Sequence, residues 1–404
     1  MAVGLTQPAE IFPVAGIDLA ASTAGLYKKE RLDLALMALA DGAVTSAVFT
    51  KNTFCAAPVL VARQHLRTSS PRYLIINAGN ANAGTGERGM IDALEVCRAL
   101  ADTAACPVTA VLPFSTGVIG EYLPVNQIKH KIPELLASMD RDNWLTVARS
   151  IMTTDTVVKA VSRQVEIDGR TVTITAIAKG AGMIRPDMAT MLAFIATDIG
   201  IEQELLNRIF INAVEKSFNR ISVDGDTSTN DACVLVATGK GQYTVTPESP
   251  GLAATEDLIT EVCTELAQAI VRDGEGATKF ITVEIGGGRN KQECLQAAYA
   301  IANSPLVKTA FFASDPNWGR ILAAIGRAGL PELDISAVSI FLDNVCIVEQ
   351  GMRSQSYSED AGVKVMQQDE ILIRVKLGRG QASETIWTCD LSHEYVKINA
   401  EYRT

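Results

Sequence analysis

The chain has 404 residues, of which 48% are hydrophobic and 20% charged, and its mean hydropathy is +0.16. This composition fits a protein with a large apolar core and excludes a disordered chain. The 36 basic and 46 acidic residues give a formal net charge of −10 without a basic patch, which argues against nucleic acid as a partner. No apolar run reaches membrane-spanning length, and residues 1–16 lack a secretory or transit signal, so a cytoplasmic protein is expected.

The length alone fits two or three domains or one large intertwined unit. Cysteines are scattered and form no C-x-x-C pair, so reduced core thiols are expected rather than disulfides or zinc ligands. The histidines, His65, His130 and His393, lie in polar stretches and are expected to be exposed. None of them belongs to a motif that would place a histidine against a nucleophile. If the protein is an enzyme with a nucleophile, a group other than histidine must therefore act as the base that activates it.

In the first half, hydrophobic alternation and turn residues mark the expected elements. Residues 32–50 alternate on both sides of Asp41–Gly42, which predicts a β-hairpin. A second hairpin is predicted over residues 161–178, turning at Asp168–Gly169. The pattern also predicts strands over residues 73–77 and 109–112 and helices over residues 90–101, 125–139 and 144–152.

The second half continues in the same manner. Strands are predicted over residues 191–196, 232–237, 280–285, 339–349 and 371–376, and helices over residues 202–218 and 254–272 and after Asp315. The chain is expected to end on an alternating strand. No low-complexity linker and no internal repeat divides it.

Several polar loops between these elements could carry ligands. Residues 77–82 and the glycines after them could cradle an anion, although tight turns are the commoner reason for such a pattern. Residues 219–231 contain three aspartates but lack the bidentate glutamate of an EF-hand, so that interpretation is rejected. Residues 273–279 do not satisfy the phosphate-loop pattern either.

The stretch from Lys179 to Ile199 is the most informative part of the sequence. A glycine-rich turn precedes Ala189–Thr190, and a buried-strand pattern follows directly. A threonine hydroxyl acts as a nucleophile at neutral pH only when a base lies within hydrogen-bond reach. A free α-amine, with a pKa of about 7.7–8, can be that base. This chemistry requires a cut between Ala189 and Thr190, made by attack of the hydroxyl on its own preceding carbonyl. On spacing alone, an ordinary turn before a strand is the more common explanation.

This stretch resembles the self-cleaving segment of the ornithine acetyltransferase family, the bifunctional glutamate N-acetyltransferases of arginine biosynthesis. The family pattern K-G-x-G-M-I-x-P-x-M-A-T-M-L is matched throughout. The resemblance extends along nearly the whole chain, through the blocks F-T-x-N, N-A-G-N-A-N, S-T-G-V-I-G, M-T-T-D-T, D-G-E-G-A-T-K and the terminal N-A-x-Y-x-T.

The resemblance implies a role for individual residues. Ala189 and Thr190 flank the cleavage site, and Thr190 becomes the nucleophile. Thr116 and Gly117 hold the oxyanion. The remaining residues contact substrate together with Thr190, and they are Thr153 (with Thr154 as its near neighbour), Lys179, Glu275, Asn399 and Thr404.

The resemblance also implies a fold and an assembly. The fold expected is α/β (α+β), a DmpA/ArgJ-like sandwich of β-sheets flanked by helices. Its two self-cleaved fragments, an alpha fragment of residues 1–189 and a beta fragment of residues 190–404, are expected to be intertwined. A heterotetramer of two alpha and two beta fragments is implied.

The implied reaction moves an acetyl group from N2-acetyl-L-ornithine to L-glutamate through acetyl-Thr190, without a metal or organic cofactor. Whether acetyl-CoA also serves as a donor is left open. An aminopeptidase or amidase with the same N-terminal nucleophile is the rival enzyme class. A binding or structural protein whose strand merely begins at Thr190 is the non-enzyme alternative.

Overall fold

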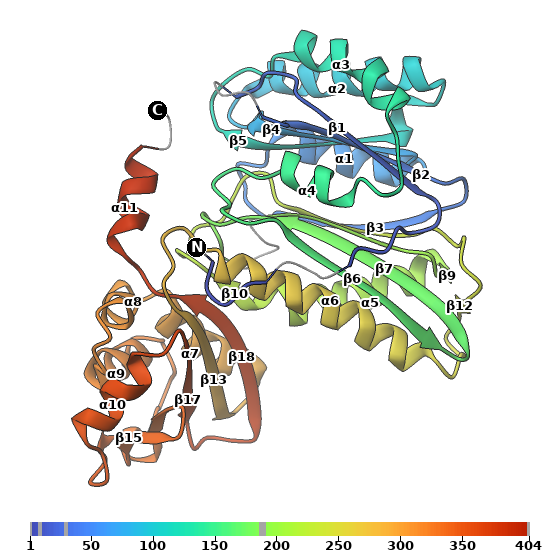
Figure 1. Ribbon diagram of the computed structural model, residues 1–404. Helices are drawn as coiled ribbons and strands as arrows, with labels where there is room; N and C mark the ends of the chain where they lie inside the picture. The colour runs from blue at the N-terminus through green and yellow to red at the C-terminus, as the bar shows by residue number, and fades with distance from the viewer. Residues whose placement is uncertain (1, 7–9, 28–30, 186–190, 402–404) are drawn as a thin grey trace.

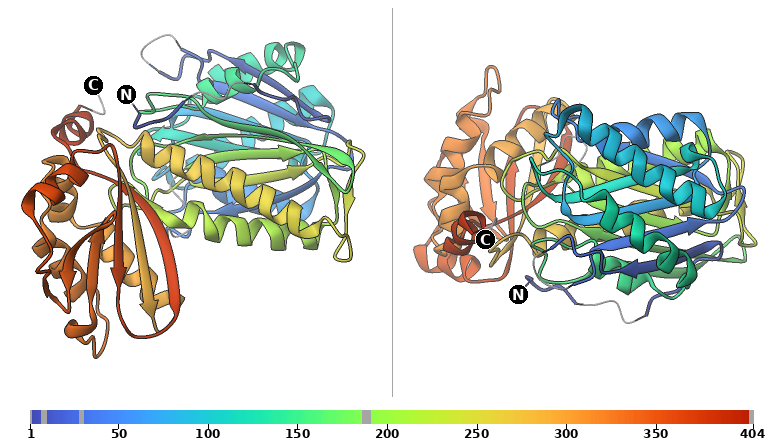
Figure 2. Two further views of the ribbon diagram at one scale, coloured as in Figure 1. Left: turned by 60° about the horizontal axis from the view of Figure 1, so that its bottom comes forward. Right: turned by 90° about the horizontal axis from the view of Figure 1, so that it is seen from above.

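The structure is a computed structural model that describes residues 2–6, 10–27, 31–185 and 191–401. The chain forms a layered body followed by a smaller lobe, which projects from one end of that body (Figures 1 and 2). The body contains two β-sheets packed face to face with helices outside them, and the lobe contains a third large sheet.

The first sheet of the body has the strand order β1-β2-β4-β5. The first three strands in this order are antiparallel neighbours, whereas β4 and β5 are parallel. Its members are β1 (Ile17–Ser22), β2 (Leu34–Leu39), β4 (Tyr73–Asn80) and β5 (Val111–Val118).

The second sheet has the strand order β3-β11-β8-β7-β6. The pair β11 and β8 is parallel and the other neighbours are antiparallel. Its members are β3 (Val44–Phe49), β6 (Lys159–Ile167), β7 (Arg170–Lys179), β8 (Leu192–Thr197) and β11 (Ala232–Ala237). A small two-stranded sheet of β9 (Gly200–Ile201) and β12 (Thr244–Val245) lies beside it.

An apolar core fills the space between the two sheets. Phe114 of β5 meets Phe194 of β8 edge to face, with ring centroids 5.2 Å apart. Two helices add buried side chains to this inner core, namely α1 (Ala57–Thr68) and α4 (Trp144–Ser150). The first sheet is covered outside by α2 (Gly86–Ala104) and α3 (Val125–Ala137), and the second by α5 (Gln203–Lys216) and α6 (Leu252–Arg272).

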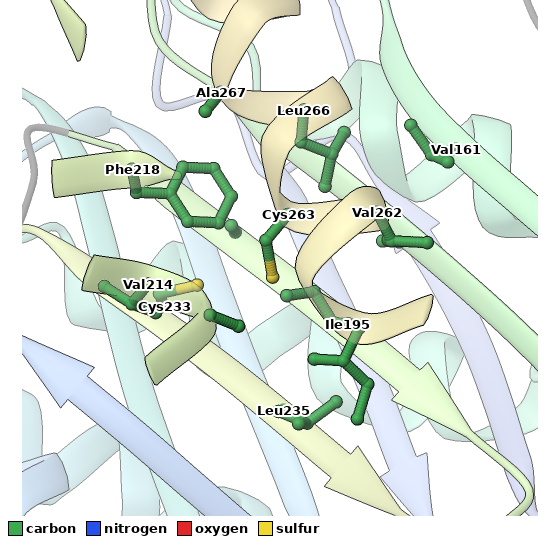
Figure 3. Packing of buried hydrophobic residues seen from close by; sticks show 14 of the residues in the cluster. Val161, Ile195, Val214, Phe218, Cys233, Leu235, Val262, Cys263, Leu266 and Ala267 are labelled. Atoms are coloured by element: carbon green, nitrogen blue, oxygen red, sulfur yellow. The ribbon is translucent and has the colours of Figure 1, made fainter. Parts of the chain in front are cut away.

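A second apolar core lies between the five-stranded sheet and the helices α5 and α6. Figure 3 shows Cys263 and Leu266 of α6 facing Cys233, Leu235 and Ile195 of the sheet. Burial raises the pKa of the Cys263 thiol to about 12, so this sulfur stays protonated and unreactive at neutral pH. All eight cysteines are free, as expected from their scattered positions.

The lobe is built on a seven-stranded sheet with the order β10-β18-β13-β17-β14-β15-β16. Its strands are β10 (Ile221–Ser222), β13 (Phe280–Gly288), β14 (Ser339–Leu342), β15 (Val345–Glu349), β16 (Met352–Arg353), β17 (Glu370–Lys376) and β18 (Ala382–Cys389). Its helices are α7 (Lys291–Ala302), α8 (Pro305–Phe312), α9 (Trp318–Gly326) and α10 (Glu359–Met366). Only β10 comes from the chain before residue 280, so this short strand ties the lobe to the body.

The described chain leaves β18 and ends just after the helix α11 (His393–Ala400), which has no buried side chain and projects from the lobe in Figure 1. At its first residue, the His393 ring packs edge to face against Phe312 of α8, with ring centroids 5.4 Å apart. The alternating strand predicted for this end is therefore wrong. The alternating hydrophobic pattern lies within β18, and the polar residues that follow it form a helix on the surface. Among the described residues, no helix is both long and apolar enough to cross a membrane.

Two further predictions are wrong. The strands β2 and β3 do not form a hairpin, because β2 pairs with β1 and β4 whereas β3 pairs with β11 in the other sheet. The turn at Asp41–Gly42 carries the chain from one sheet to the other. His65 is buried rather than exposed, and its Nδ1 lies 2.7 Å from the carbonyl oxygen of Val111.

The predicted sandwich of sheets flanked by helices is confirmed, and so is the hairpin of β6 and β7. Strand β8 lies between β7 and β11, so residues before and after position 190 share one sheet. The lobe is different, because residues after 220 supply all of its strands. Division into fragments 1–189 and 190–404 stays a prediction.

Candidate active site

A cavity of about 270 Å³ opens where strand ends of both body sheets meet the loops before β11 and β13. Six of the residues predicted from the sequence line it, and they are Thr116, Gly117, Thr153, Lys179, Glu275 and Asn399. Thr154, the alternative to Thr153, lines it as well. The other lining residues are Ala81, Val118, Ile119, Gly182, Met183, Ser228, Thr229 and Asn230.

Ala189, Thr190 and Thr404, which complete the predicted set, lie outside the described residues. The described chain resumes at Met191, whose carbonyl oxygen accepts the backbone N–H of Ala232 at 3.0 Å. Leu192 then pairs with Lys179, a residue that lines the cavity. The strand that follows the predicted nucleophile thus begins beside the cavity.

Thr116 and Gly117 lie on β5 where it pairs with the end of β4. Gly117 has a φ of +133°, and a Cβ atom there would lie 2.3 Å from the carbonyl carbon of Gly79. Only glycine permits this close approach of the two strands. The backbone N–H groups at this position are therefore held rigidly, which is the property an oxyanion hole needs.

Asn230 holds the same strand ends together, and the sequence did not predict it as a site residue. Its Nδ2 donates to the carbonyl oxygens of Ala81 at 2.6 Å and Ser115 at 2.9 Å. Its Oδ1 accepts from the Thr229 hydroxyl at 2.6 Å. The only signal in the sequence was its place in the polar loop of residues 219–231, which was considered there solely as a calcium loop.

Lys179 is the cation of the cavity. Its side chain is 9% exposed, and its Nζ donates to the Thr116 hydroxyl oxygen at 3.2 Å. Burial lowers the pKa of this ammonium group, and the nearby Asp155 carboxylate opposes that effect. The pKa of the Lys179 ammonium group therefore depends on its surroundings, with burial lowering it and Asp155 raising it.

Asp155 connects Lys179 to a buried group of charges behind the cavity. Its Oδ1 accepts from Lys159 Nζ at 2.6 Å and from the backbone N–H of Gly180 at 2.7 Å. Burial by itself would raise the pKa of the Asp155 carboxyl, but the Lys159 and Lys179 charges outweigh it and hold the pKa below its usual value.

Lys159 completes this network through a second carboxylate. Its Nζ lies 2.5 Å from Asp273 Oδ2, and the side chains of Lys159, Asp155 and Asp273 are at most 1% exposed. Asp273 also accepts the backbone N–H of Thr156 at 3.0 Å. Two carboxylates thus balance two ammonium groups, Lys159 and Lys179. Both aspartates lie within the blocks M-T-T-D-T and D-G-E-G-A-T-K, but the sequence predicted no role for them.

Glu275 is the anion of the cavity and is 8% exposed. Its Oε2 accepts from Asn399 Nδ2 at 2.7 Å. A Cβ atom at Gly182 would lie 2.4 Å from the Glu275 carboxyl group, so the glycine turn after Lys179 allows this carboxylate to reach the site.

The terminal helix α11 closes one side of the cavity through polar contacts. The Ser392 hydroxyl donates to the Gly276 carbonyl oxygen at 2.6 Å, and the Tyr395 hydroxyl donates to Asp224 Oδ2 at 3.3 Å. Asp224 accepts the backbone N–H groups of Met183 and Ile184 at 2.6 and 2.9 Å. These bonds place Asn399 over the cavity.

Within the described ranges, no group of three or more His, Cys, Asp or Glu side chains is arranged to hold a metal ion. The cavity offers a hydroxyl with adjacent N–H groups, one ammonium group and one carboxylate. These groups can stabilise an oxyanion and bind a small zwitterion.

Comparison with known proteins agrees with this geometry. The sequence profile of the ArgJ family matches residues 18–404. The chain is 55% identical to the arginine biosynthesis bifunctional protein ArgJ of Pseudomonas syringae pv. tomato and 53% identical to that of Pseudomonas fluorescens, and each alignment covers 100% of both chains. The chain belongs to the ArgJ family.

A solved structure of the ArgJ protein of Bacillus halodurans is also similar. It is 40% identical, with a TM-score of 0.50, and the alignment covers 52% of this chain and 99% of that one. Family membership confirms the expectation of an arginine-biosynthesis enzyme over the aminopeptidase and structural alternatives.

Proposed function

We propose that this enzyme transfers the acetyl group of N2-acetyl-L-ornithine to L-glutamate through an acetyl ester on Thr190. The observation that carries the proposal is the convergence of Thr116, Gly117, Lys179 and Glu275 on one cavity beside the start of β8. These residues come from distant parts of the chain, and each has the chemistry that one step of the reaction requires.

The acyl step begins when the Thr190 hydroxyl attacks the acetyl carbon of acetylornithine, with the α-amine of Thr190 as the base. The tetrahedral oxyanion accepts hydrogen bonds from the Gly117 N–H and the Thr116 hydroxyl. The Thr116 oxygen accepts from Lys179, which leaves the hydroxyl hydrogen able to point at the oxyanion. The carbon–nitrogen bond then breaks, and the amine proton passes to the departing ornithine nitrogen.

Substrate binding uses the two charges of the cavity. The Lys179 ammonium can pair with a substrate carboxylate, and the Glu275 carboxylate can pair with a substrate ammonium. Ornithine and glutamate are both small amino acids, which suits a cavity of about 270 Å³. One cavity of this size serves donor and acceptor in turn. This proposed chemistry uses no metal or organic cofactor.

Steady-state kinetics test the proposal. A single nucleophile that serves both substrates predicts ping-pong behaviour, with parallel double-reciprocal lines for acetylornithine and glutamate. Labelled acetylornithine without acceptor should leave the label on the peptide that begins with Thr190. Intersecting lines together with an unlabelled peptide would contradict the acyl-enzyme.

We further propose that the chain cuts itself between Ala189 and Thr190. The resulting fragments, 1–189 and 190–404, are proposed to stay together as a cytoplasmic heterotetramer of two copies of each. Denaturing mass spectrometry should show two masses, the second from a fragment beginning at Thr190. Native mass spectrometry should give the mass of the four-fragment assembly. A full-length mass from fully active protein would contradict the amine-base mechanism.

A further inference from the structure

Lys308 of helix α8 is a buried cation that the proposed reaction does not use. The residue is 3% exposed, and Figure 1 shows α8 beside the place where the chain leaves β18 for α11. Its Nζ donates to the Thr388 hydroxyl oxygen at 3.0 Å and to the carbonyl oxygen of Cys389. In the part of the chain that the structure describes, no carboxylate forms an ion pair with this ammonium group.

An ammonium group without a buried counter-charge is an unfavourable way to fill space in a protein. Its removal from water costs free energy, and neutral hydrogen-bond acceptors offset that cost only in part. A methionine side chain could fill a similar space without this cost. What Lys308 provides, and an apolar side chain cannot, is a set of hydrogen bonds that fix the backbone after β18. The carbonyl oxygen of Lys308 adds one more bond, from the Leu391 N–H at 3.3 Å.

The segment that Lys308 fixes is bound in turn to the loop that carries Glu275. Asp390, which is 1% exposed, accepts the backbone N–H groups of Thr278 at 2.8 Å and Lys279 at 2.9 Å. Its other carboxylate oxygen accepts the Thr278 hydroxyl at 2.6 Å. The position of the loop after Glu275 therefore depends on the position of Asp390.

Two glycines show how closely the two segments approach each other. A Cβ atom at Gly274 would lie 3.1 Å from the Cys389 sulfur, and one at Gly276 would lie 2.6 Å from the Ser392 hydroxyl oxygen. Glu275 stands between these two contacts in the chain. Closely packed segments transmit displacements, so a shift of the backbone after β18 moves the loop on both sides of Glu275.

We infer that Lys308 is a positioning residue, which sets the place of the Glu275 carboxylate in the catalytic cavity. This inference rests on the proposed function, in which Glu275 pairs with an ammonium group of the substrate. Lys308 fixes the end of β18, Asp390 fixes the loop after Glu275, and the carboxylate is thereby held against the substrate. A displacement of about 1 Å at such a group lowers the rate about 10²-fold.

Two acetyl donors that differ by one group test the inference. N2-acetyl-L-norvaline has the carbon chain of N2-acetyl-L-ornithine but lacks its side-chain ammonium group. In Lys308→Met, kcat/KM for acetylornithine should fall about tenfold to a hundredfold, because the carboxylate no longer meets that ammonium group closely. The value for acetylnorvaline, or its inhibition constant if it is not turned over, should stay within about twofold, since this donor forms no ion pair there. Equal losses with both donors, or no loss with acetylornithine, would overturn the inference.

A double-mutant cycle tests the route through Glu275. Glu275→Gln removes the charge that Lys308 positions, so adding Lys308→Met to it should lower kcat/KM for acetylornithine by no more than about twofold. Losses that multiply, as those of independent sites do, would overturn the inference. If Glu275→Gln by itself does not discriminate between the two donors, the proposed role of Glu275 fails and the inference fails with it. Absence of any acetyl transfer from acetylornithine by the unaltered enzyme would instead refute the proposed function.

Arg379→Met is the control that separates positioning from stability. Arg379 is another buried cation of the lobe, 5% exposed, with its Nε 2.5 Å from Glu293 Oε1. Its partners neither line the catalytic cavity nor belong to the loop of residues 273–279. Both Arg379→Met and Lys308→Met should lower Tm, but Arg379→Met should keep the preference for acetylornithine over acetylnorvaline. A changed preference in Arg379→Met would overturn the inference, because any weakening of the lobe would then suffice.

Lys308→Gln keeps the inference testable if Lys308→Met does not fold. Glutamine retains a hydrogen-bond donor without the charge, so the end of β18 keeps part of its anchorage. The fall in kcat/KM for acetylornithine should be smaller than in Lys308→Met and should again spare acetylnorvaline. Equal losses with both donors in Lys308→Gln would overturn the inference.

Discussion

The two walls of the catalytic cavity are held in place by different means. The wall that carries Thr116, Gly117 and Lys179 consists of the ends of β5 and β7, and those strands are fixed by the apolar core between and outside the sheets. The opposite wall includes Asn399 on α11, a helix with no buried side chain. That helix is held mainly by polar contacts of Ser392, Tyr395 and Asn399, together with one edge-to-face contact between the rings of His393 and Phe312.

This difference matches the demands of the proposed reaction. Groups that stabilise charge must stay within fractions of an ångström of their position, which a packed core can ensure. A cover over the substrate has to admit and release it. Individual hydrogen bonds contribute only about 1 kcal/mol each, so a helix held by a few of them can open. Changes in the strand-end wall should therefore cost more activity than changes in α11.

The largest effect is expected for Thr190→Ala. This variant should remain a single uncut chain without measurable transfer, because it has neither a nucleophile nor a hydroxyl to cut the preceding bond. Mass spectrometry and the transfer assay measure the two outcomes. Thr260→Ala, which removes a hydroxyl that only bonds within α6, is the control and should be cut and active. A cut Thr190→Ala protein would disprove self-cleavage by this hydroxyl.

The second-largest loss of activity is expected for Gly117→Ala. The added Cβ would meet the backbone of Gly79 at 2.3 Å and displace the oxyanion donors, so kcat should fall about 10²- to 10³-fold. Gly326→Ala is the matched control, because nothing lies within 4 Å of a Cβ at that helical position. A Gly117→Ala enzyme with normal kcat would remove this residue from the oxyanion hole.

Removing residues 399–404 tests the wall of the cavity that includes Asn399 on α11. The truncated protein should fold and be cut normally, since the cleavage groups lie elsewhere, but kcat/KM should fall about 10²-fold because the substrate is less well positioned. Asn399→Ala alone should show a smaller fall, through the lost bond to Glu275. Full activity in the truncated enzyme would show that residues 399–404 do not position the substrate, and Asn399 and Thr404 would no longer be site residues.

The smallest effect on activity is expected for Asp155→Asn. Burial lowers the pKa of Lys179, and Asp155 is the largest influence that raises it, ahead of the weaker Asp231 and Glu275 contributions, while Lys159 acts to lower it. Without Asp155 the pKa of Lys179 falls further, so the ammonium charge is lost at a lower pH. The KM for glutamate should rise about tenfold at neutral pH, and the decline of kcat/KM with increasing pH should begin earlier.

Asp273→Asn is the control for that experiment. Both variants leave Lys159 short of one buried partner and should lose about 3–5 kcal/mol of unfolding free energy in denaturant titrations. Only Asp155→Asn should shift the pH profile, because Asp155 acts on Lys179 directly. Identical pH profiles in both variants would assign Asp155 a purely structural role.

The sequence predicted local structure and the lining of the cavity well. The strand 232–237 and the helix starting at Val125 are found where hydrophobic periodicity placed them. Six predicted site residues line one cavity because the family blocks coincide with strand ends and loops, where backbone turns expose side chains.

Long-range pairing was harder to predict. Alternation makes β2 and β3 look like one hairpin, and nothing within residues 32–50 indicates that each strand finds its partners far away in the chain. The lobe depends in part on β10, whose residues Ile221 and Ser222 are too few to give a pattern. Burial of Asp155, Lys159 and Asp273 could not be foreseen either, because charged residues are normally exposed unless a partner reaches them.

The connection between β7 and β8 is a place where the chain can be divided without disturbing the sheet. Lys179 and Leu192 are paired neighbours, yet residues 180–191 join them where a two-residue turn would suffice. Opening the chain inside this connection removes no bond of the sheet, because β8 is held by β7 on one side and β11 on the other. New termini could therefore be engineered at this place, with the gene split there into two co-expressed halves that assemble the same sheet.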